Sequence, residues 1–190
     1  MLRPLQFGLL LLALLALVGP APAVAKGDGP SVVDLTTALD GRRVLVSLGL
    51  SGAWDEATRE RLEAGLPTGF TFEIELLRDR KHWWDDGLVE CRVEVVAMYN
   101  ALTREYLVNT KQDGKLVDSR TVREAQDLAR SLTRLSAVPA FVVPEAVLGQ
   151  RLLVRARALL GSSTWLGFFP TSDETSWTES RKFRVPVEQP

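Results

Sequence analysis

Apolar and polar residues alternate with a period of two along most of the chain after residue 30. The clearest run is TGFTFEIELL at residues 68–77, where Phe70, Phe72 and Ile74 share one parity and polar residues take the other. This pattern is typical of β-strands with one buried face and one wet face. Similar runs lie at residues 33–39, 44–50, 89–99, 105–111, 115–119, 151–160 and 183–187. AFVV at residues 140–143 is bracketed by prolines, which predicts an edge strand or an extended connector.

Two segments break the alternation and predict short helices. In residues 54–64, Asp55 is placed as the N-cap, Leu62 as the docking residue and Gly65 as the helix end. The second helix is predicted to begin at TVRE, residues 121–124, which has the pattern of a capping box. Roughly eight strands joined mostly by short turns, with only two helices, predict an antiparallel two-sheet β-sandwich that is immunoglobulin-like in general architecture.

The first 25 residues have the features of a secretory signal peptide. Arg3 provides a small positive region, and an almost pure Leu and Ala run from Phe7 to Val18 is followed by the A-x-A pattern that ends at Ala25. A bilayer span needs about 20 apolar residues, so this run is short for a permanent anchor, which is the alternative. We expect cleavage after Ala25, a flexible lead-in at residues 26–30 and one domain at residues 31–188, in the periplasm or secreted.

Charge and cysteine content narrow the class of protein. The chain has 23 Lys and Arg against 24 Asp and Glu, and loss of Arg3 with the signal peptide changes the net charge from −1 to −2. A nearly neutral chain does not favour nucleic acid as a partner, and no second long apolar run predicts a membrane span after cleavage. Cys91 is the only cysteine. We expect it to be a small buried apolar residue, with an intermolecular disulfide as the alternative.

The stretch RDRKHWWDDG at residues 78–87 lies between the two strongest predicted strands and contains the only histidine, His82. Two interpretations fit Trp83 and Trp84. They pack over the open end of the core, with Arg80 or Lys81 against an indole face, or they are exposed and anchor another protein or an envelope polymer. We favour packing and keep binding as the functional hypothesis.

Catalytic and metal-binding patterns are weak in this sequence. A Ser–His–Asp relay would need His82 with Asp85 or Asp86, and no G-x-S-x-G motif marks a nucleophile. Adjacent aspartates diverge on an extended chain, and one histidine with scattered carboxylates has no recognised metal spacing. We therefore expect a non-catalytic protein without a cofactor or a metal ion.

Charged residues form rows on the predicted strands. Arg151, Arg155 and Arg157 share one face of their strand, and Lys182 and Arg184 share one face of the last strand. On neighbouring strands these rows would form a basic stripe that could hold an anionic group. We favour the alternative, in which they pair with acidic rows, because exposed sheet faces usually mix charges. The acidic residues concerned are Glu73, Glu75, Glu90 and Glu94.

The order of these features resembles the bacterial family known only as domain of unknown function 4390. The resemblance rests on GLPTGFTFEIEL at residues 65–76, the R-x-R-x-x-W-W-x-D pattern from Arg78 to Asp86, YNALTREYLV at 99–108 and LLVRARALL at 152–160. It implies an exported envelope protein with no assigned activity, whose genes are associated with neighbours that encode sensor kinases. It supplies no catalytic residues.

These features predict an exported protein that uses loop tips and a sheet edge to bind another envelope protein, such as the extracytoplasmic region of a sensor kinase. One alternative is a carrier of a small apolar or anionic ligand, held in a dry cavity between the two sheets. The second alternative function is that of a hydrolase. The predicted contacts are Arg80, His82, Trp83 and Trp84, with Tyr99, Arg104 and Tyr106 as a second cluster that would otherwise belong to the core.

Overall fold

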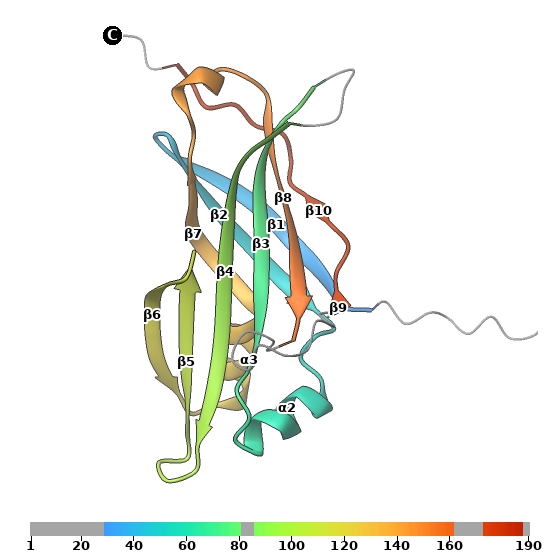
Figure 1. Ribbon diagram of the computed structural model, residues 1–190, viewed down its shortest axis with the longest axis vertical. Coiled ribbons are helices and arrows are strands. Elements are labelled where there is room, and N and C mark those ends of the chain that lie inside the picture. Colours follow the sequence, from blue (N-terminus) through green and yellow to red (C-terminus); the bar gives the residue numbers. More distant parts are fainter. Residues whose placement is uncertain (1–28, 81–85, 162–172, 188–190) are drawn as a thin grey trace, which may run out of the picture.

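The computed structural model describes residues 29–80, 86–161 and 173–187, which form two antiparallel sheets packed face to face (Figure 1). The smaller sheet consists of β1 (Ser31–Asp40), β2 (Arg43–Ser51) and β7 (Arg134–Val142), in the order β1-β2-β7. The larger sheet consists of β3 (Thr68–Arg78), β4 (Asp86–Asn100), β5 (Glu105–Gln112), β6 (Lys115–Val122), β8 (Leu152–Leu160), β9 (Asp173–Glu174) and β10 (Thr178–Glu179). Its order is β10-β8-β3-β4-β5-β6, with β9 beside β8. The predicted β-sandwich is confirmed.

Alternate side chains of the two sheets fill the space between them. Val44 and Val46 on β2, and Phe72 and Ile74 on β3, are all 0% exposed and belong to one continuous cluster of buried residues. Their parity is the apolar parity of the sequence, so the period-two pattern placed the correct face inward. Burying each such side chain stabilises the fold by about 1.5–3 kcal/mol, which is what holds the two sheets together.

The first predicted helix is present as α2 (Glu56–Glu63). Asp55 caps it by accepting a hydrogen bond from the amide of Thr58 at 2.8 Å, and Leu62 is fully buried in the core. Gly65 ends the helix with a φ of 83°, a backbone conformation that glycine adopts without steric cost. Each of the three predicted roles is confirmed.

The start of the second helix, α3 (Ala125–Thr133), was predicted wrongly. Thr121 is not an N-cap but a residue of β6, paired with Leu107 of β5. The N-cap is Glu124, whose side chain makes no capping hydrogen bond. The β5–β6 ladder keeps the backbone of residue 121 extended, and this long-range pairing overrides the local capping pattern. Leu128 and Leu132 anchor the helix in the core.

The first three residues of AFVV belong to β7, an edge strand of the smaller sheet, as predicted. Pro139 lies within β7, where an edge position tolerates a residue without an amide hydrogen. A single-turn helix, η1 (Glu145–Val147), follows and leads into β8.

The predicted last strand at residues 183–187 is wrong. In its place the C-terminal segment runs along β8 through the two-residue strands β9 and β10 and an isolated bridge between Leu152 and Phe183. The hydroxyl of Thr175 accepts from the amide of Ala158 at 3.0 Å, and that of Ser180 accepts from Val154 at 2.9 Å. These hydroxyl groups accept hydrogen bonds where backbone carbonyls would do so in a regular strand. The β-ladder between β8 and the C-terminal segment is therefore interrupted.

The molecule is elongated and its two ends differ (Figure 1). One end, here called the η1 end, carries the β1–β2 turn, η1 and the ends of β3 and β4 at Arg78 and Asp86. The other, the α2 end, carries α2 and the β4–β5 turn. Among the described residues, no helix is long and apolar enough to cross a bilayer.

Candidate functional site

The predicted contacts fall at opposite ends of the molecule. His82, Trp83 and Trp84 lie outside the described residues, while Arg80 lies just beyond the end of β3 at the η1 end. Tyr99 is at the far end of β4, thirteen positions along the strand from Asp86. At about 3.3 Å per residue the two ends of this strand are separated by roughly 43 Å, so the structure does not join Arg80 and Tyr99 into one site.

The second predicted cluster divides into a packed pair and an exposed turn residue. The rings of Tyr99 and Tyr106 lie 5.0 Å apart between centroids, tilted by 41°, and both pack against the core. Burial raises the pKa of Tyr106 above its ordinary value, and the nearby Glu63 carboxylate adds to the effect. Arg104 is exposed in the β4–β5 turn with a φ of 56°. The tyrosines therefore close the core at the α2 end.

Ion pairs surround the base of the β3–β4 hairpin. Asp86 Oδ2 accepts from Arg78 Nη2 at 2.5 Å and from Arg80 Nη2 at 2.7 Å. Asp79 contacts Lys182 Nζ at 2.9 Å and Arg151 Nη1 at 3.4 Å. The hydrogen bond from Lys182 is the largest cause of a lowered pKa at Asp79, with a smaller contribution from Arg151. The hairpin is thus joined to β8 and to the C-terminal segment.

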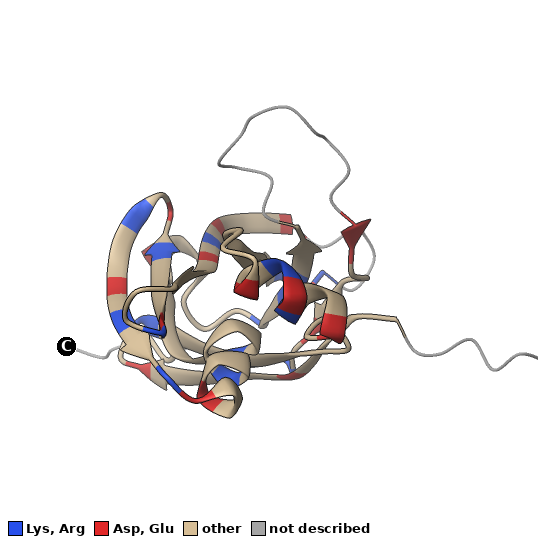
Figure 2. Cartoon of the chain, turned by 90° about the horizontal axis from the view of Figure 1, so that it is seen from below, with Lys and Arg blue, Asp and Glu red and all other residues tan. Residues whose placement is uncertain are grey.

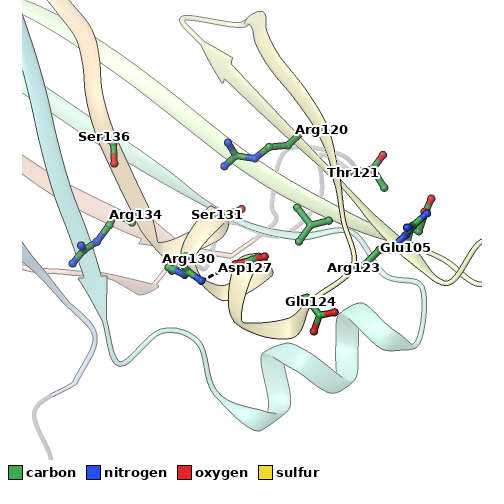
Figure 3. A pocket seen from close by; sticks show the side chains of 11 residues that line it. Glu105, Arg120, Thr121, Arg123, Glu124, Asp127, Arg130, Ser131, Arg134 and Ser136 are labelled. Carbon is green, nitrogen blue, oxygen red and sulfur yellow. Dashed lines mark hydrogen bonds and ion pairs between the residues drawn. The ribbon is translucent and has the colours of Figure 1, made fainter.

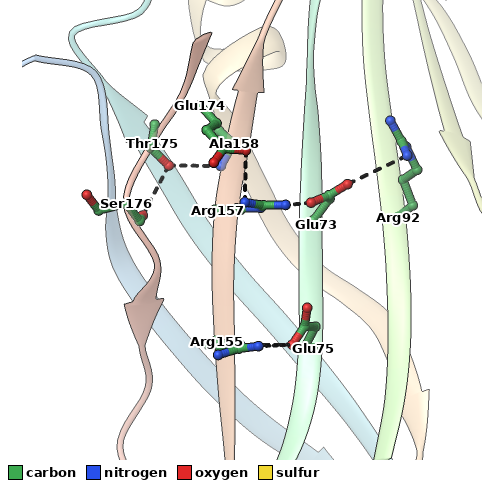
Figure 4. A network of polar contacts seen from close by, with 9 residues as sticks. All are labelled: Glu73, Glu75, Arg92, Arg155, Arg157, Ala158, Glu174, Thr175 and Ser176. Atoms are coloured by element: carbon green, nitrogen blue, oxygen red, sulfur yellow. Dashed lines mark hydrogen bonds and ion pairs between the residues drawn. The ribbon is translucent and has the colours of Figure 1, made fainter. Parts of the chain in front are cut away.

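The arginine row on β8 pairs with the acidic row on β3, as favoured from the sequence (Figure 4). Arg155 Nη2 lies 2.7 Å from Glu75 Oε2, and Arg157 Nε lies 2.8 Å from Glu73 Oε2. Both guanidinium groups also lie against the ring of Trp177, at 4.5 and 4.6 Å from its centroid. Because these arginines already have carboxylate and aromatic partners, this face is a structural network that secures the C-terminal segment.

An open groove of about 970 Å³ lies between β6 and β7, with α3 along its floor (Figure 3). The end of β6 forms one wall and the start of β7 the other, because α3 connects the two strands and passes from one sheet to the other. The polar lining residues are Glu105, Arg120, Thr121, Arg123, Glu124, Asp127, Arg130, Ser131, Arg134 and Ser136. This groove is the site that sequence reasoning missed.

Four arginines line the groove, and each has an acidic partner, which is exposed in every pair except that of the half-buried Glu105. Arg130 lies 2.6 Å from Asp127 and Arg123 lies 2.5 Å from Glu105. The other two contacts are longer: Arg134 to Asp34 at 3.4 Å and Arg120 to Asp118 at 3.5 Å. Ion pairs this exposed contribute about 0–1 kcal/mol, so a ligand carboxylate can replace the present partner at little cost.

The two walls of the groove end in strand edges. β6 is the last strand of the larger sheet and β7 the last of the smaller, and no described strand pairs with the outer edge of either. Seven of the eight residues of β6 are exposed. At the far end of the groove, Gln112 Nε2 donates to the carbonyl of Pro139 at 3.0 Å and ties β5 to β7. An edge strand offers unused backbone donors and acceptors to an extended segment.

The sequence contains one weak pattern that could have indicated the groove. Arg123, Arg130 and Arg134 follow one another at intervals of seven and four residues, a spacing that places side chains on one side of a helix. The chain here is strand, helix and strand, so the arginines converge only through tertiary packing. Among the described residues there is no group of three or more His, Cys, Asp or Glu side chains that could hold a metal ion.

Cys91 is buried in the core, as expected for a small apolar residue. Burial raises the pKa of its thiol from 9.0 to about 11, and Asp113 adds a smaller contribution. Its sulfur accepts a long hydrogen bond from Gln112 Nε2 at 3.4 Å. A thiol at 2% exposure is not accessible to a second protein, so the alternative of an intermolecular disulfide is wrong.

Comparison with known proteins gives one match. No curated protein and no solved structure matches this chain. The model of a protein family described as Domain of unknown function (DUF4390) matches residues 27–165, well over half of the chain. The match includes the smaller sheet, β3 to β6 and β8 of the larger sheet, α2, α3 and every residue that lines the groove. The protein therefore belongs to the DUF4390 family.

Proposed function

We propose that this protein is an exported, non-catalytic binding module that holds an extended segment of another envelope protein in the groove between β6 and β7. The observation that carries the proposal is the position of the groove between two strand edges that no described strand covers. Main-chain pairing to a strand edge provides affinity, and flanking side chains provide specificity.

Export is part of the proposal and rests on the sequence. Residues 1–25 have the charge, apolar run and cleavage pattern of a secretory signal peptide. The family match begins at residue 27, two residues after the expected cleavage position, which supports a boundary between leader and domain.

The side chains of β6 suit selective binding. Leu116 and Val117 are 59% and 57% exposed, which gives a partner strand apolar contacts. Asp118 and Arg120 share the parity of the buried Val122 and therefore lie on the inner side of the strand. Inward-facing charges on an edge strand discourage indiscriminate strand pairing, so a partner must supply matching charges.

The first partner to test is the extracytoplasmic region of a sensor kinase, which the family resemblance suggests. Arg80, His82, Trp83 and Trp84 remain a second candidate contact. The carrier alternative has no observation in its favour, because the buried side chains of both sheets form one continuous cluster in the space that a carried ligand would occupy.

Site-specific photocrosslinking in intact cells tests the proposal. A photoreactive residue at Ser136, in the groove, is expected to capture a protein partner, whereas one at Leu39, 41% exposed on the far end of β1, is the matched control. A third position, Trp83, tests the tryptophan stretch. Capture at Trp83 with none at Ser136 would move the contact from the groove to that stretch, and capture at neither position would refute the binding proposal.

A further inference from the structure

Basic side chains gather at the η1 end from three segments that are far apart in the sequence. Ladder pairing and ion pairs bring together residues 78–80 and 86, Arg151 at the start of β8, and residues 181–184. Within these segments six side chains are cationic and two are acidic, in a chain whose net charge is −1. We call this surface the basic end; its cations are Arg78, Arg80, Arg151, Arg181, Lys182 and Arg184.

The two acidic residues of the basic end are each shared between two cations. Asp86 lies between Arg78 and Arg80, and Asp79 between Arg151 and Lys182. Each of these two groups thus contains two cations and one carboxylate among the described residues. Arg181 and Arg184 are exposed on the C-terminal segment, and no ion pair joins them to an acidic residue within the described ranges.

The opposite end carries the opposite charge. Figure 2 views the molecule from the α2 end and shows acidic residues along α2. From Asp55 to Glu63 the chain has four acidic and two basic side chains. The nearly neutral protein is thus polarised along its long axis, and a field of this kind orients it toward an anionic surface with the basic end first.

We propose that the basic end docks on a membrane surface that contains anionic phospholipids. Arg80, Arg151 and the cations of residues 181–184 are exposed, and they belong to segments that reach the η1 end of the molecule, where several lipid phosphates could be contacted at once. A guanidinium group can donate two parallel hydrogen bonds to the oxygens of one phosphate, and clustered basic residues are attracted to anionic bilayers.

This proposal does not depend on the groove. Residues of α3 line the groove, and α3 lies in the half of the molecule that carries α2 (Figure 1). A protein attached through its basic end therefore still presents the groove away from the lipid. Binding of lipid and binding of a protein partner can therefore be lost separately by mutation.

Vesicle co-sedimentation tests the proposal. The protein, expressed as the full chain and purified without detergent, is mixed with vesicles of phosphatidylcholine alone or with one third phosphatidylglycerol. We expect it to sediment with the anionic vesicles, to be released by high salt, and to remain in solution with the neutral vesicles. The neutral vesicles also control for insertion of the apolar residues 7–18.

Charge reversal locates the binding surface. Each basic residue near an anionic bilayer contributes about a fivefold gain in association, so the double variant Arg181→Glu and Arg184→Glu is expected to weaken it at least about 25-fold. The control, Arg61→Glu with Lys115→Glu, makes the same charge change at exposed sites on α2 and β6 and is expected to retain binding. Unchanged circular dichroism shows that both variants fold.

Three results would overturn the proposal. The first is equal sedimentation with neutral and anionic vesicles, and the second is equal loss of binding in the two double variants. The third is failure to bind any vesicle while polyglutamate binds in a manner that requires Arg181 and Arg184. That result would assign the basic end to an acidic protein.

Discussion

Arg78 and Asp86 form the last pair of the β3–β4 ladder, and their side chains meet as well, with Nη2 of the arginine 2.5 Å from Oδ2 of the aspartate. Arg80 reaches the same oxygen at 2.7 Å. The residues that flank Trp83 and Trp84 in the sequence are therefore joined through one carboxylate. This carboxylate joins the described ends of β3 and β4 at the η1 end.

Separate substitutions of Trp83 and Trp84 by alanine distinguish packing from binding. We predict that each lowers the Tm by more than about 5 °C, because truncating a packed aromatic side chain costs several kcal/mol. Trp54→Ala, which removes an indole that packs against the core, provides the comparison in thermal unfolding followed by circular dichroism. An unchanged Tm together with loss of the photocrosslinked partner would instead assign the pair to binding.

Gly69 is required by the close approach of β3 to β4. A Cβ at this position would lie 2.1 Å from the carbonyl oxygen of Val95, which is backbone and cannot rotate away. We predict that Gly69→Ala lowers the free energy of unfolding by at least about 2 kcal/mol in urea titration. Gly87→Ala is the matched control, since a Cβ there has no neighbour within 4 Å. A Gly69→Ala variant as stable as the control would contradict this packing argument.

Trp177 connects the C-terminal segment to β8 through both Arg155 and Arg157. We predict that Trp177→Ala lowers the free energy of unfolding by about 2 kcal/mol, because two cation–π contacts and part of the buried ring surface are lost. Trp177→Phe keeps an aromatic face and should cost less than half as much. Equal losses in the two variants would show that the ring face is not what stabilises the segment.

The thiol of Cys91 should show the pH dependence of a buried group. Its pKa is raised to about 11 from 9.0, so its contribution to stability is fully present below pH 9 and is lost as the pH rises through about 11. We predict slow labelling by iodoacetamide at pH 8 in the native protein and rapid labelling in urea. The Cys91→Ala variant should lose less stability than the wild type between pH 9 and 11. Fast native labelling at pH 8 would contradict the burial.

Much of the fold was predictable from short-range patterns. Phe72 and Ile74 faced the core because alternation is a local property of an extended chain, and Asp55, Leu62 and Gly65 marked α2 through contacts within a few residues. The helix start at Thr121 and the last strand at residues 183–187 were predicted wrongly. In each case a distant partner decided the backbone: β5 for the first, and the amides of β8 for the second.

The sequence by itself determined that strands dominate, which of their faces are apolar, and where two short helices interrupt them. Only the tertiary structure decided which charged rows neutralise one another and which remain as a surface. Arg155 and Arg157 pair with glutamates of β3 because β8 lies in register beside that strand. Arg151 and Lys182 instead contact Asp79 and are part of the basic end. The groove likewise exists because α3 passes from the edge of one sheet to the edge of the other. Alternation is read from neighbouring residues, but strand order and register are set by the burial of the whole core.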